Sequence, residues 1–242
     1  MNRIFISDLH LQDVTEQSFQ CLAALLQVEG QHVDEVYILG DLVEMWVGDD
    51  DQTPAALSLV ELLAQATQHC DLFLMHGNRD FLIGDDFAEA TGVKLIADPT
   101  VLDGHILLAH GDALCTDDQA YQQARSVLRS EAWQRDILQK SLEDRLALGR
   151  QMRAESMSNN ANKASSIMDV NPEATAQLMQ AYDADLLIHG HTHRPGDHRL
   201  SNAGRRLRRL VLGDWSHCGW LVRQRGQAFS LECFSLVDHY GT

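Results

Sequence analysis

The chain has 242 residues, which is enough for one sizeable α/β core and a small accessory lobe. Hydrophobic residues make up 45% and charged residues 22%, and this balance excludes a disordered or fibrous chain. The formal net charge of −16 argues against a general nucleic-acid-binding protein, because contacts with phosphates need a basic surface.

Short apolar runs alternate with longer helical patterns, which is typical of a layered α/β fold. The apolar runs predict core strands over residues 3–7, 36–39, 72–75, 106–109 and 186–189. A three-and-four spacing of apolar residues predicts a helix over 19–26, and a second helix is expected over 55–68. After residue 197, further short strands are expected over 206–212, 219–223 and 229–234.

The segment 117–168 differs from the rest of the chain. It has no strand pattern, a single glycine and helix-favouring stretches such as 141–156. We therefore expect a helical cap over 117–168, inserted into a core that consists of residues 1–116 and 169–242. A turn and a helix start follow at 169–172, where Asn171 precedes Pro172.

Each of the five core strands is followed by a residue type that binds metals. The candidate ligands are Asp8, His10, Asp41, Asn78, His110, His191 and His193. Loops beyond the carboxyl ends of strands in α/β sheets form ligand sites, so these side chains can converge. Carboxylate, amide and imidazole donors without thiolates suit divalent ions such as Mn²⁺, Fe²⁺ or Zn²⁺. A two-metal site needs a bridging group, and Asp41 is the natural candidate.

Taken singly, none of these signals is specific. A lone histidine at a strand end is more often a structural hydrogen-bonding residue than a metal ligand. The conjunction of five motifs in order, each after an apolar strand and most beside a glycine, favours a metal centre.

The motif order D-x-H, G-D, G-N-x-D, H-G-D and G-H-x-H resembles the calcineurin-like metallophosphoesterase superfamily over residues 8–193. The resemblance implies a four-layer α/β/β/α sandwich. It also implies two metal sites: Asp8, His10, Asp41 and His193 for one ion, and Asp41, Asn78, His110 and His191 for the other.

Arg79 departs from the superfamily pattern, in which most members have a histidine thought to protonate the leaving group. An arginine cannot act as a general acid at neutral pH, but it binds phosphate oxygens bidentately and stabilises developing charge. A phosphate leaving group, with a second pKa of about 6, needs little protonation. The substitution therefore favours cleavage of a pyrophosphate over cleavage of an alkyl phosphoester.

The motif Gly77-Asn78-Arg79-Asp80 closely resembles the UDP-2,3-diacylglucosamine pyrophosphohydrolase family of bacterial lipid A biosynthesis, with further matches at 110–118, 152–156, 167–172 and 212–215. The resemblance implies attack of a metal-activated water on the uridine-side phosphorus, giving UMP and the diacylated sugar 1-phosphate. It implies two divalent ions, and the absence of thiolates favours Mn²⁺ over Zn²⁺. It also implies a peripheral location on the cytoplasmic side of the inner membrane.

The resemblance implies catalytic roles for Asn78, Arg79 and His191, and substrate contacts by Asn78, Arg79, Asp118, Ser156, Asn160, Lys163 and His191. In a helix, Ser156, Asn160 and Lys163 share one face, although a merely solvated face is the alternative. Tyr121 and Arg153 are weaker candidates for the same pocket. Apolar cap residues either line an acyl-chain groove or pack the cap itself: Leu128, Trp133, Ile137, Leu138, Leu142 and Leu146.

The segment 194–225 carries eight arginines against two aspartates, a net charge of +6 in an acidic chain. Together with Trp215 and Trp220, it suggests peripheral contact with anionic lipid. The alternative is a solvated strand face or an edge strand protected by charge. The five cysteines form no Cys-x-x-Cys pair, no apolar run approaches the roughly 18 residues of a membrane span, and the N-terminus lacks a signal-peptide pattern. We therefore expect free thiols in a reducing cytosol.

Two other functions remain open at this point. Another metallophosphoesterase chemistry, such as a cyclic-nucleotide phosphodiesterase or a protein phosphatase, predicts a histidine in place of Arg79 and needs no cap. A binding module that has lost its metals predicts at least one missing ligand, whereas all seven are present.

Overall fold

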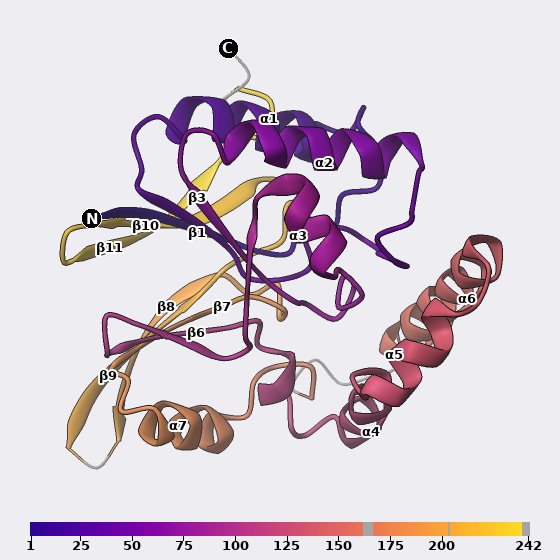
Figure 1. Cartoon of the computed structure of the whole chain (residues 1–242). Helices are drawn as coiled ribbons and strands as arrows, with labels where there is room; N and C mark the ends of the chain where they lie inside the picture. Colours follow the sequence, from indigo (N-terminus) through magenta and orange to yellow (C-terminus); the bar gives the residue numbers. More distant parts are fainter. Residues whose placement is uncertain (162–166, 203, 239–242) are drawn as a thin grey trace.

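Two β-sheets packed face to face form the centre of the protein, and helices cover both outer faces (Figure 1). The computed structural model describes residues 1–161, 167–202 and 204–238. Helices α1 (Gln17–Glu29) and α2 (Pro54–Ala66) cover one sheet, and α7 (Pro172–Ala181) covers the other. This is the four-layer α/β/β/α sandwich that the sequence predicted.

The first sheet has the order β11-β10-β1-β2-β3-β4, with β1 to β4 parallel and β10 and β11 antiparallel. Its strands are β1 (Asn2–Ile6), β2 (Glu35–Ile38), β3 (Asp71–Met75), β4 (Lys94–Ile96), β10 (Gly219–Arg225) and β11 (Ala228–Phe234). The second sheet has the order β5-β6-β7-β9-β8. Its strands are β5 (Thr100–Leu102), β6 (Ile106–Ala109), β7 (Leu186–His189), β8 (Gly196–Asn202) and β9 (Arg205–Val211).

All eight strands predicted from the sequence are present, and three further strands were missed. Strands β4 and β5 have only three residues each, too few to show a periodic pattern. Strand β8 is an edge strand of mostly polar sequence, which its pairing with β9 holds in place. The sequence also did not reveal which of the five core strands belong to which of the two sheets.

Alternation of side chains along the strands builds two cores. In β1, Ile4 and Ile6 face the helices, whereas Phe5 points between the sheets. Register places Phe5 beside Tyr37 and Tyr37 beside Phe73, and their rings stack with centroids 5.2 and 4.6 Å apart. Since the strands are buried on both faces, they read as continuous apolar runs, which is why the sequence predicted them.

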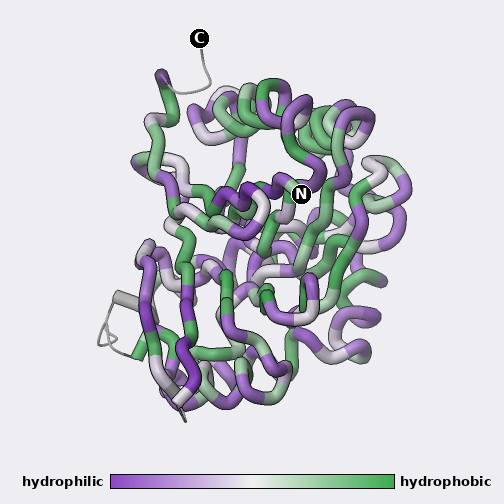
Figure 2. Tube along the Cα trace, turned by 90° about the vertical axis from the view of Figure 1, so that its left-hand side faces the viewer, coloured by the Kyte–Doolittle hydropathy of each residue, from purple (hydrophilic) through white to green (hydrophobic). Residues whose placement is uncertain are grey.

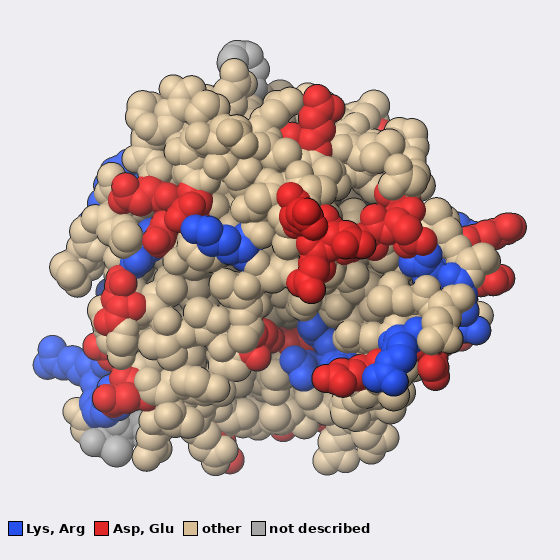
Figure 3. Space-filling view, viewed as in Figure 1, with Lys and Arg blue, Asp and Glu red and all other residues tan. Residues whose placement is uncertain are grey.

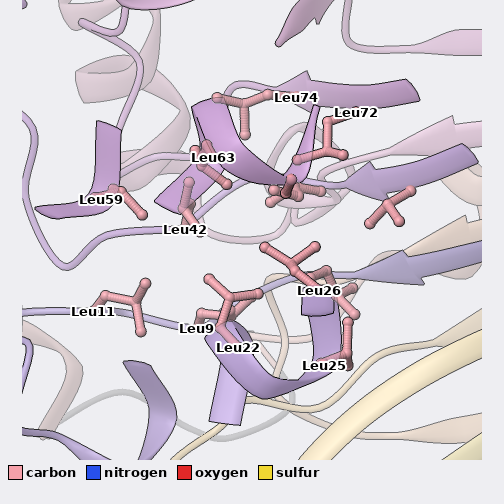
Figure 4. Close-up of a cluster of buried hydrophobic side chains, with 14 of the residues drawn as sticks. Leu9, Leu11, Leu22, Leu25, Leu26, Leu42, Leu59, Leu63, Leu72 and Leu74 are labelled. Atoms are coloured by element: carbon pink, nitrogen blue, oxygen red, sulfur yellow. The ribbon is translucent and has the colours of Figure 1, made fainter. Parts of the chain in front are cut away.

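A leucine-rich cluster joins the first sheet to its helices. Leu22, Leu25 and Leu26 of α1 and Leu59 and Leu63 of α2 gather with leucines of β3 and of the loops after β1 and β2 (Figure 4). The hydropathy of the chain follows this layering, with apolar segments inside and polar ones at the surface (Figure 2). A smaller cluster on the second sheet packs Leu107 and Leu187 against Met179 of α7.

The segment after β6 is helical. It contains a short 3₁₀ turn (Asp112–Leu114), then α4 (Gln119–Leu128), α5 (Glu131–Leu138) and α6 (Leu142–Ala161), which lie to one side of the two sheets (Figure 1). The expected helix over 141–156 is part of α6. A further helix, α3 (Asp85–Thr91), precedes β4. None of the helices in the described ranges combines the length and apolarity of a bilayer span.

Candidate metal centre

The seven candidate ligands follow strands of both sheets. Asp8 and His10 follow β1, Asp41 follows β2 and Asn78 follows β3, and these three strands are neighbours in the first sheet. His110 follows β6, and His191 and His193 follow β7, its parallel neighbour in the second sheet. The carboxyl ends of the two sheets therefore meet at this point, and the ligands come from both.

The first group of ligands consists of Asp8, His10 and His193, whose ligand atoms lie within 4.8 Å of one another. His10 Nε2 lies 3.2 Å from His193 Nε2, and His193 Nε2 lies 3.4 Å from Asp8 Oδ1. Two imidazole nitrogens this close need a cation or a shared proton between them. This arrangement fits a divalent ion.

The second group consists of Asp41, His110 and His191, again with ligand atoms within 4.8 Å. Asn78 joins it, because its Oδ1 lies 3.0 Å from His110 Nε2 and 2.8 Å from His191 Nδ1. Asp41 lies between the two groups. Its Oδ1 is 3.7 Å from His110 Nε2, and its Oδ2 is 3.9 Å from His10 Nε2.

Burial shifts the pKa values of Asp41 and His191 in the second group. Complete burial raises the pKa of Asp41 to about 6, since a carboxylate without water around it is costly. Burial, together with the neighbouring His110, lowers the pKa of His191 to about 3. His191 is therefore neutral at pH 7, and a neutral imidazole is the form that binds a metal.

The ligand loops have an unusual backbone. Five non-glycine ligand residues have positive φ angles: Asp8 (56°), His10 (52°), Asp41 (54°), His191 (67°) and His193 (54°). Each left-handed residue of this kind costs on the order of 1–3 kcal/mol, and such strain gathers at functional sites. Backbone bonds between adjacent loops hold the conformation, since Asp8 N donates to Gly40 O and His10 N to Asp41 O.

Two motif glycines allow the carboxylates to lie against the neighbouring loops. A Cβ on Gly77 would lie 2.2 Å from Asp41 Oδ1, and a Cβ on Gly190 would lie 2.1 Å from Asp8 Oδ2. Any side chain at these two positions would push a ligand carboxylate away. This close approach is the physical reason for glycine before Asn78 and before His191.

Asp80 and Asp112 are the last residues of the motifs G-N-x-D and H-G-D, and the sequence assigned neither of them a role. Both are fully buried. Asp80 accepts hydrogen bonds from Leu42 N and Gly77 N at 2.7 Å each, and thereby joins the loops after β2 and β3. The available signal was an aspartate two residues after a ligand, and the structure explains it, because a buried carboxylate needs several hydrogen-bond donors.

Asp112 attaches α4 to the centre. Its Oδ2 accepts a hydrogen bond from Tyr121 Oη at 2.9 Å and one from Arg125 Nε at 2.8 Å. Arg129 extends the contact, since its Nη2 donates to Gly77 O at 2.8 Å. On α6, the buried Arg145 donates to Val47 O at 2.6 Å. The helices of 119–161 therefore bond to three of the ligand loops.

The structure places the remaining candidate residues as follows. Arg79 lies beside the second group, where its backbone N donates to Asp41 Oδ1 at 2.9 Å. Its Nε is buried and has no hydrogen-bond partner among the described residues. Asp118 is buried at the start of α4 and accepts from Tyr121 N, and Ser156 is half-buried on α6. Lys163 and the side chain of Asn160 lie outside the described residues.

Of the two weaker candidates, Tyr121 lies at the centre, with its ring 5.8 Å from that of His191. Arg153 pairs with Glu44, a residue that sequence analysis did not consider. Among the apolar cap residues, Ile137 is buried and Leu138 is exposed. The other four are half-buried: Leu128, Trp133, Leu142 and Leu146.

The basic segment differs from the sequence expectation in one respect. Trp215 is buried, its ring packs against Phe234, and its Nε1 donates to Trp220 O, so it cannot insert into a membrane. Arg208 pairs with Asp197 and Arg223 with Glu29.

The calcineurin-like phosphoesterase family profile matches residues 1–195. Fold, ligand set and family thus define a metallophosphoesterase, which supports divalent metal ions as cofactors. An archaeal phosphodiesterase structure aligns with 97% of this chain and 100% of its own, with a TM-score of 0.47 and 11% identity.

Two curated relatives are much more similar. The UDP-2,3-diacylglucosamine hydrolase of Cellvibrio japonicus (strain Ueda107) is 45% identical over 226 residues, covering 92% of this chain and 94% of that protein. The protein of the same name from Marinobacter nauticus (strain ATCC 700491 / DSM 11845 / VT8) is 42% identical over 243 residues, covering 98% and 100%. The chain belongs to the calcineurin-like phosphoesterases and, within them, to the UDP-2,3-diacylglucosamine hydrolase family.

The attachment of α4 gives a prediction on stability. Asp112→Asn removes the buried charge that Arg125 and Tyr121 bond, so we expect the free energy of unfolding at pH 7 to fall by about 2–3 kcal/mol. Although burial raises the pKa of Asp112, the neighbouring His110, His191 and Arg125 lower it below its ordinary value. The stabilisation is therefore complete above the pKa of an unfolded aspartate, about 3.9, and is lost as pH falls through the lower native pKa.

Chemical denaturation over a pH series measures this difference. The control is Asp71→Asn, which breaks an exposed ion pair with Lys94 and should cost less than about 1 kcal/mol. A loss in Asp112→Asn no larger than in the control would contradict the role assigned to Asp112.

Proposed function

We propose that this chain hydrolyses the pyrophosphate bond of UDP-2,3-diacylglucosamine, giving UMP and 2,3-diacylglucosamine 1-phosphate. The main support is the position of Asp41. One of its carboxylate oxygens lies toward each ligand group, and the backbone N–H of Arg79 donates to Oδ1. The names of relatives that are 45% and 42% identical support the substrate. The presence of Arg79 instead of an acidic proton donor disfavours a cyclic-nucleotide phosphodiesterase or a protein phosphatase.

In this proposal Asp41 would be shared by two divalent ions. Asp8, His10, Asp41 and His193 would hold one ion, and Asp41, Asn78, His110 and His191 would hold the other. Such ions, when bound, lower the pKa of a water and neutralise phosphoryl oxygens for attack on the uridine-side phosphorus. The oxygen and nitrogen donors, with no thiolate among them, favour Mn²⁺ over Zn²⁺.

Arg79 supplies positive charge from the protein. Its backbone is bonded to Asp41, and its buried Nε has no hydrogen-bond partner among the described residues, so we propose that the guanidinium binds a phosphate oxygen of the substrate. A guanidinium held in this way stabilises the charge that develops during the reaction. The departing sugar 1-phosphate, with a second pKa of about 6, leaves without a proton. The site therefore does not need a general acid.

The helical segment would hold the rest of the substrate. We propose that 117–168 forms a cap on the core of residues 1–116 and 169–242, supported by the bonds from Asp112 and Gly77 to α4. Asp118 and Ser156, together with Asn160 and Lys163, would contact the substrate. His191 and Asn78 would contact both substrate and metal.

Peripheral membrane contact is proposed at the cap. A diacylated substrate resides in a bilayer, and each cap helix exposes a large apolar side chain: Val127 on α4, Leu138 on α5 and Met157 on α6. Lys and Arg side chains over α4 to α6 are interspersed with Asp and Glu (Figure 3), so the exposed apolar side chains carry this proposal. The arginines of β8 and β9 are a poorer candidate. The start of β9 lies at the amino end of the parallel strand β7, opposite the ligands, since Leu186 pairs with Arg208 and His189 with Val211.

The bridging role of Asp41 predicts coupled loss of metal and activity. We expect Asp41→Ala to abolish turnover and to retain less than one Mn²⁺ per chain after dialysis. The variant should remain folded, since burial raises the pKa of Asp41 to about 6 and the buried charge is costly without metal. Metal content and mass spectrometry of the products measure both effects, with Asp183→Ala as an exposed control. Full activity in Asp41→Ala, or in wild type with excess chelator, would exclude the two-metal proposal.

The electrostatic role of Arg79 predicts a change in substrate preference. Arg79→Ala should lose about 2.7–4 kcal/mol of transition-state stabilisation, or 10²–10³ in rate, as for loss of one oxyanion donor. Arg79→His should stay poor on the pyrophosphate and gain relative activity on phosphodiesters with alkoxide leaving groups, where a proton donor is worth about 10²–10⁴. The measurement is the ratio of kcat/KM for the two substrates. Undiminished pyrophosphatase activity with an unchanged ratio in Arg79→His would refute this role.

The proposed membrane contact predicts which residues bind lipid. The triple change Val127→Ser, Leu138→Ser and Met157→Ser should weaken sedimentation with anionic vesicles by at least about tenfold, since it removes apolar area from the contact. The control is Arg199→Ser with Arg206→Ser, two exposed changes on β8 and β9 that should leave binding within about twofold. If the two arginine changes weakened vesicle binding more than the triple change, the membrane contact would lie on β8 and β9 instead.

A further inference from the structure

A row of three side chains connects α6 to a proposed metal ligand. The guanidinium of Arg153 on α6 pairs with Glu44 Oε1, and Glu44 Oε2 lies 3.3 Å from His10 Nδ1. Glu44 is 14% exposed, so water competes little for its oxygens. No motif in the sequence pointed to this residue.

His10 presents its two nitrogens to different surroundings. Nε2 faces the first ligand group, 3.2 Å from His193 Nε2 and 3.9 Å from Asp41 Oδ2. Nδ1 is buried and makes no hydrogen bond within the described part of the chain, and Glu44 Oε2 lies 3.3 Å from it. An Nδ1–H directed at a carboxylate leaves the lone pair on Nε2, fixes the ring orientation and makes Nε2 a stronger ligand.

The same arrangement is found at His110 with a different acceptor. His110 Nδ1 lies 2.8 Å from the carbonyl oxygen of Leu39, which can only accept, so Nδ1 carries the proton and Nε2 faces Asn78. One ligand group therefore uses a backbone carbonyl for this purpose. Glu44 is the corresponding acceptor in the other group.

The backbone places Glu44 firmly beside His10. Residues Leu11 and Val43 form a parallel bridge that extends the pairing of β1 and β2 into the ligand loops. Within it, Leu11 N donates to Leu42 O at 3.1 Å, and Glu44 N donates to Leu11 O at 3.0 Å. Glu44 is thus held by the residue that follows His10, rather than by a flexible loop.

We propose that Glu44 is a positioning residue that orients His10 toward the first metal group, and that Arg153 fixes Glu44 from the cap helix α6. This inference rests on the metal groups of the proposed function. A carboxylate on the outer side of a metal-binding histidine typically contributes about 10–100-fold to metal affinity. The contact of Arg153 makes the cap part of the surroundings of the metal centre.

A purely structural role makes a different prediction. If Glu44 only attached α6 to the core, removing either partner of the ion pair would have the same effect on the metal centre. If Glu44 positions His10, removing Glu44 weakens metal binding more than removing Arg153 does. Arg153→Ala is therefore the matched control, because it breaks the same ion pair and leaves the carboxylate beside His10.

The experiment is a Mn²⁺ titration of the full chain without substrate, followed by electron paramagnetic resonance of free and bound ion. For wild type we expect two bound ions per chain. For Glu44→Ala we expect one of the two sites to weaken by about 10–100-fold, and for Arg153→Ala by less than about threefold. Glu44→Gln, which keeps the shape and an oxygen that can accept the Nδ1–H, should lie between wild type and Glu44→Ala.

Glu29→Gln controls for loss of a glutamate–arginine pair elsewhere. Glu29 is 15% exposed and bonds Arg223 of β10, outside the ligand loops. The Mn²⁺ affinities of Glu29→Gln should therefore equal those of wild type. Unchanged affinities in both Glu44 variants, or equal losses in Glu44→Ala and Arg153→Ala, would overturn the inference alone. A wild-type chain that bound no Mn²⁺ would overturn the metal groups and the proposed function with it.

Discussion

The burial of Asp41 between two groups of imidazoles is the interaction on which the rest of the site depends. A carboxylate without water is costly, and in this protein complete burial raises its pKa to about 6. The structure compensates with the Arg79 backbone N–H on one oxygen and with histidines near both. Divalent ions would complete this compensation.

The same constraint explains the geometry around the ligands. The C-terminal ends of strands from two sheets can meet only if the loops that follow them approach closely. Glycines at positions 77 and 190 permit this, because a Cβ there would lie 2.2 and 2.1 Å from the carboxylate oxygens of Asp41 and Asp8. The loops also adopt left-handed conformations at five ligand residues. Buried acids such as Asp80, bonded to two loops, hold this strained backbone in place.

The cap is attached by the few basic residues of an acidic chain. Against 35 acidic residues the protein has 19 lysines and arginines, and several of these bond the ligand loops from α4 and α6. Acidic side chains gather instead over α3 (Figure 3). In the proposed role of Glu44, the segment proposed to hold the substrate also influences a histidine of the candidate metal centre. Substrate binding and metal binding would then share one set of contacts.

The sequence by itself determined the layered α/β class, the eight longer or more apolar strands and the order of the ligand motifs. It could do so because strands buried on both faces give continuous apolar runs, and because each ligand directly follows such a run. Strands β4, β5 and β8 were not predictable, since short or polar strands show no apolar run and depend on pairing with a neighbouring strand. The assignment of each strand to one of the two sheets, the burial of Trp215, and the pairs Asp112–Arg125 and Glu44–Arg153 were decided only by the tertiary structure. Charged groups carry no periodic signal, and their partners are chosen by which surfaces the packed layers bring together.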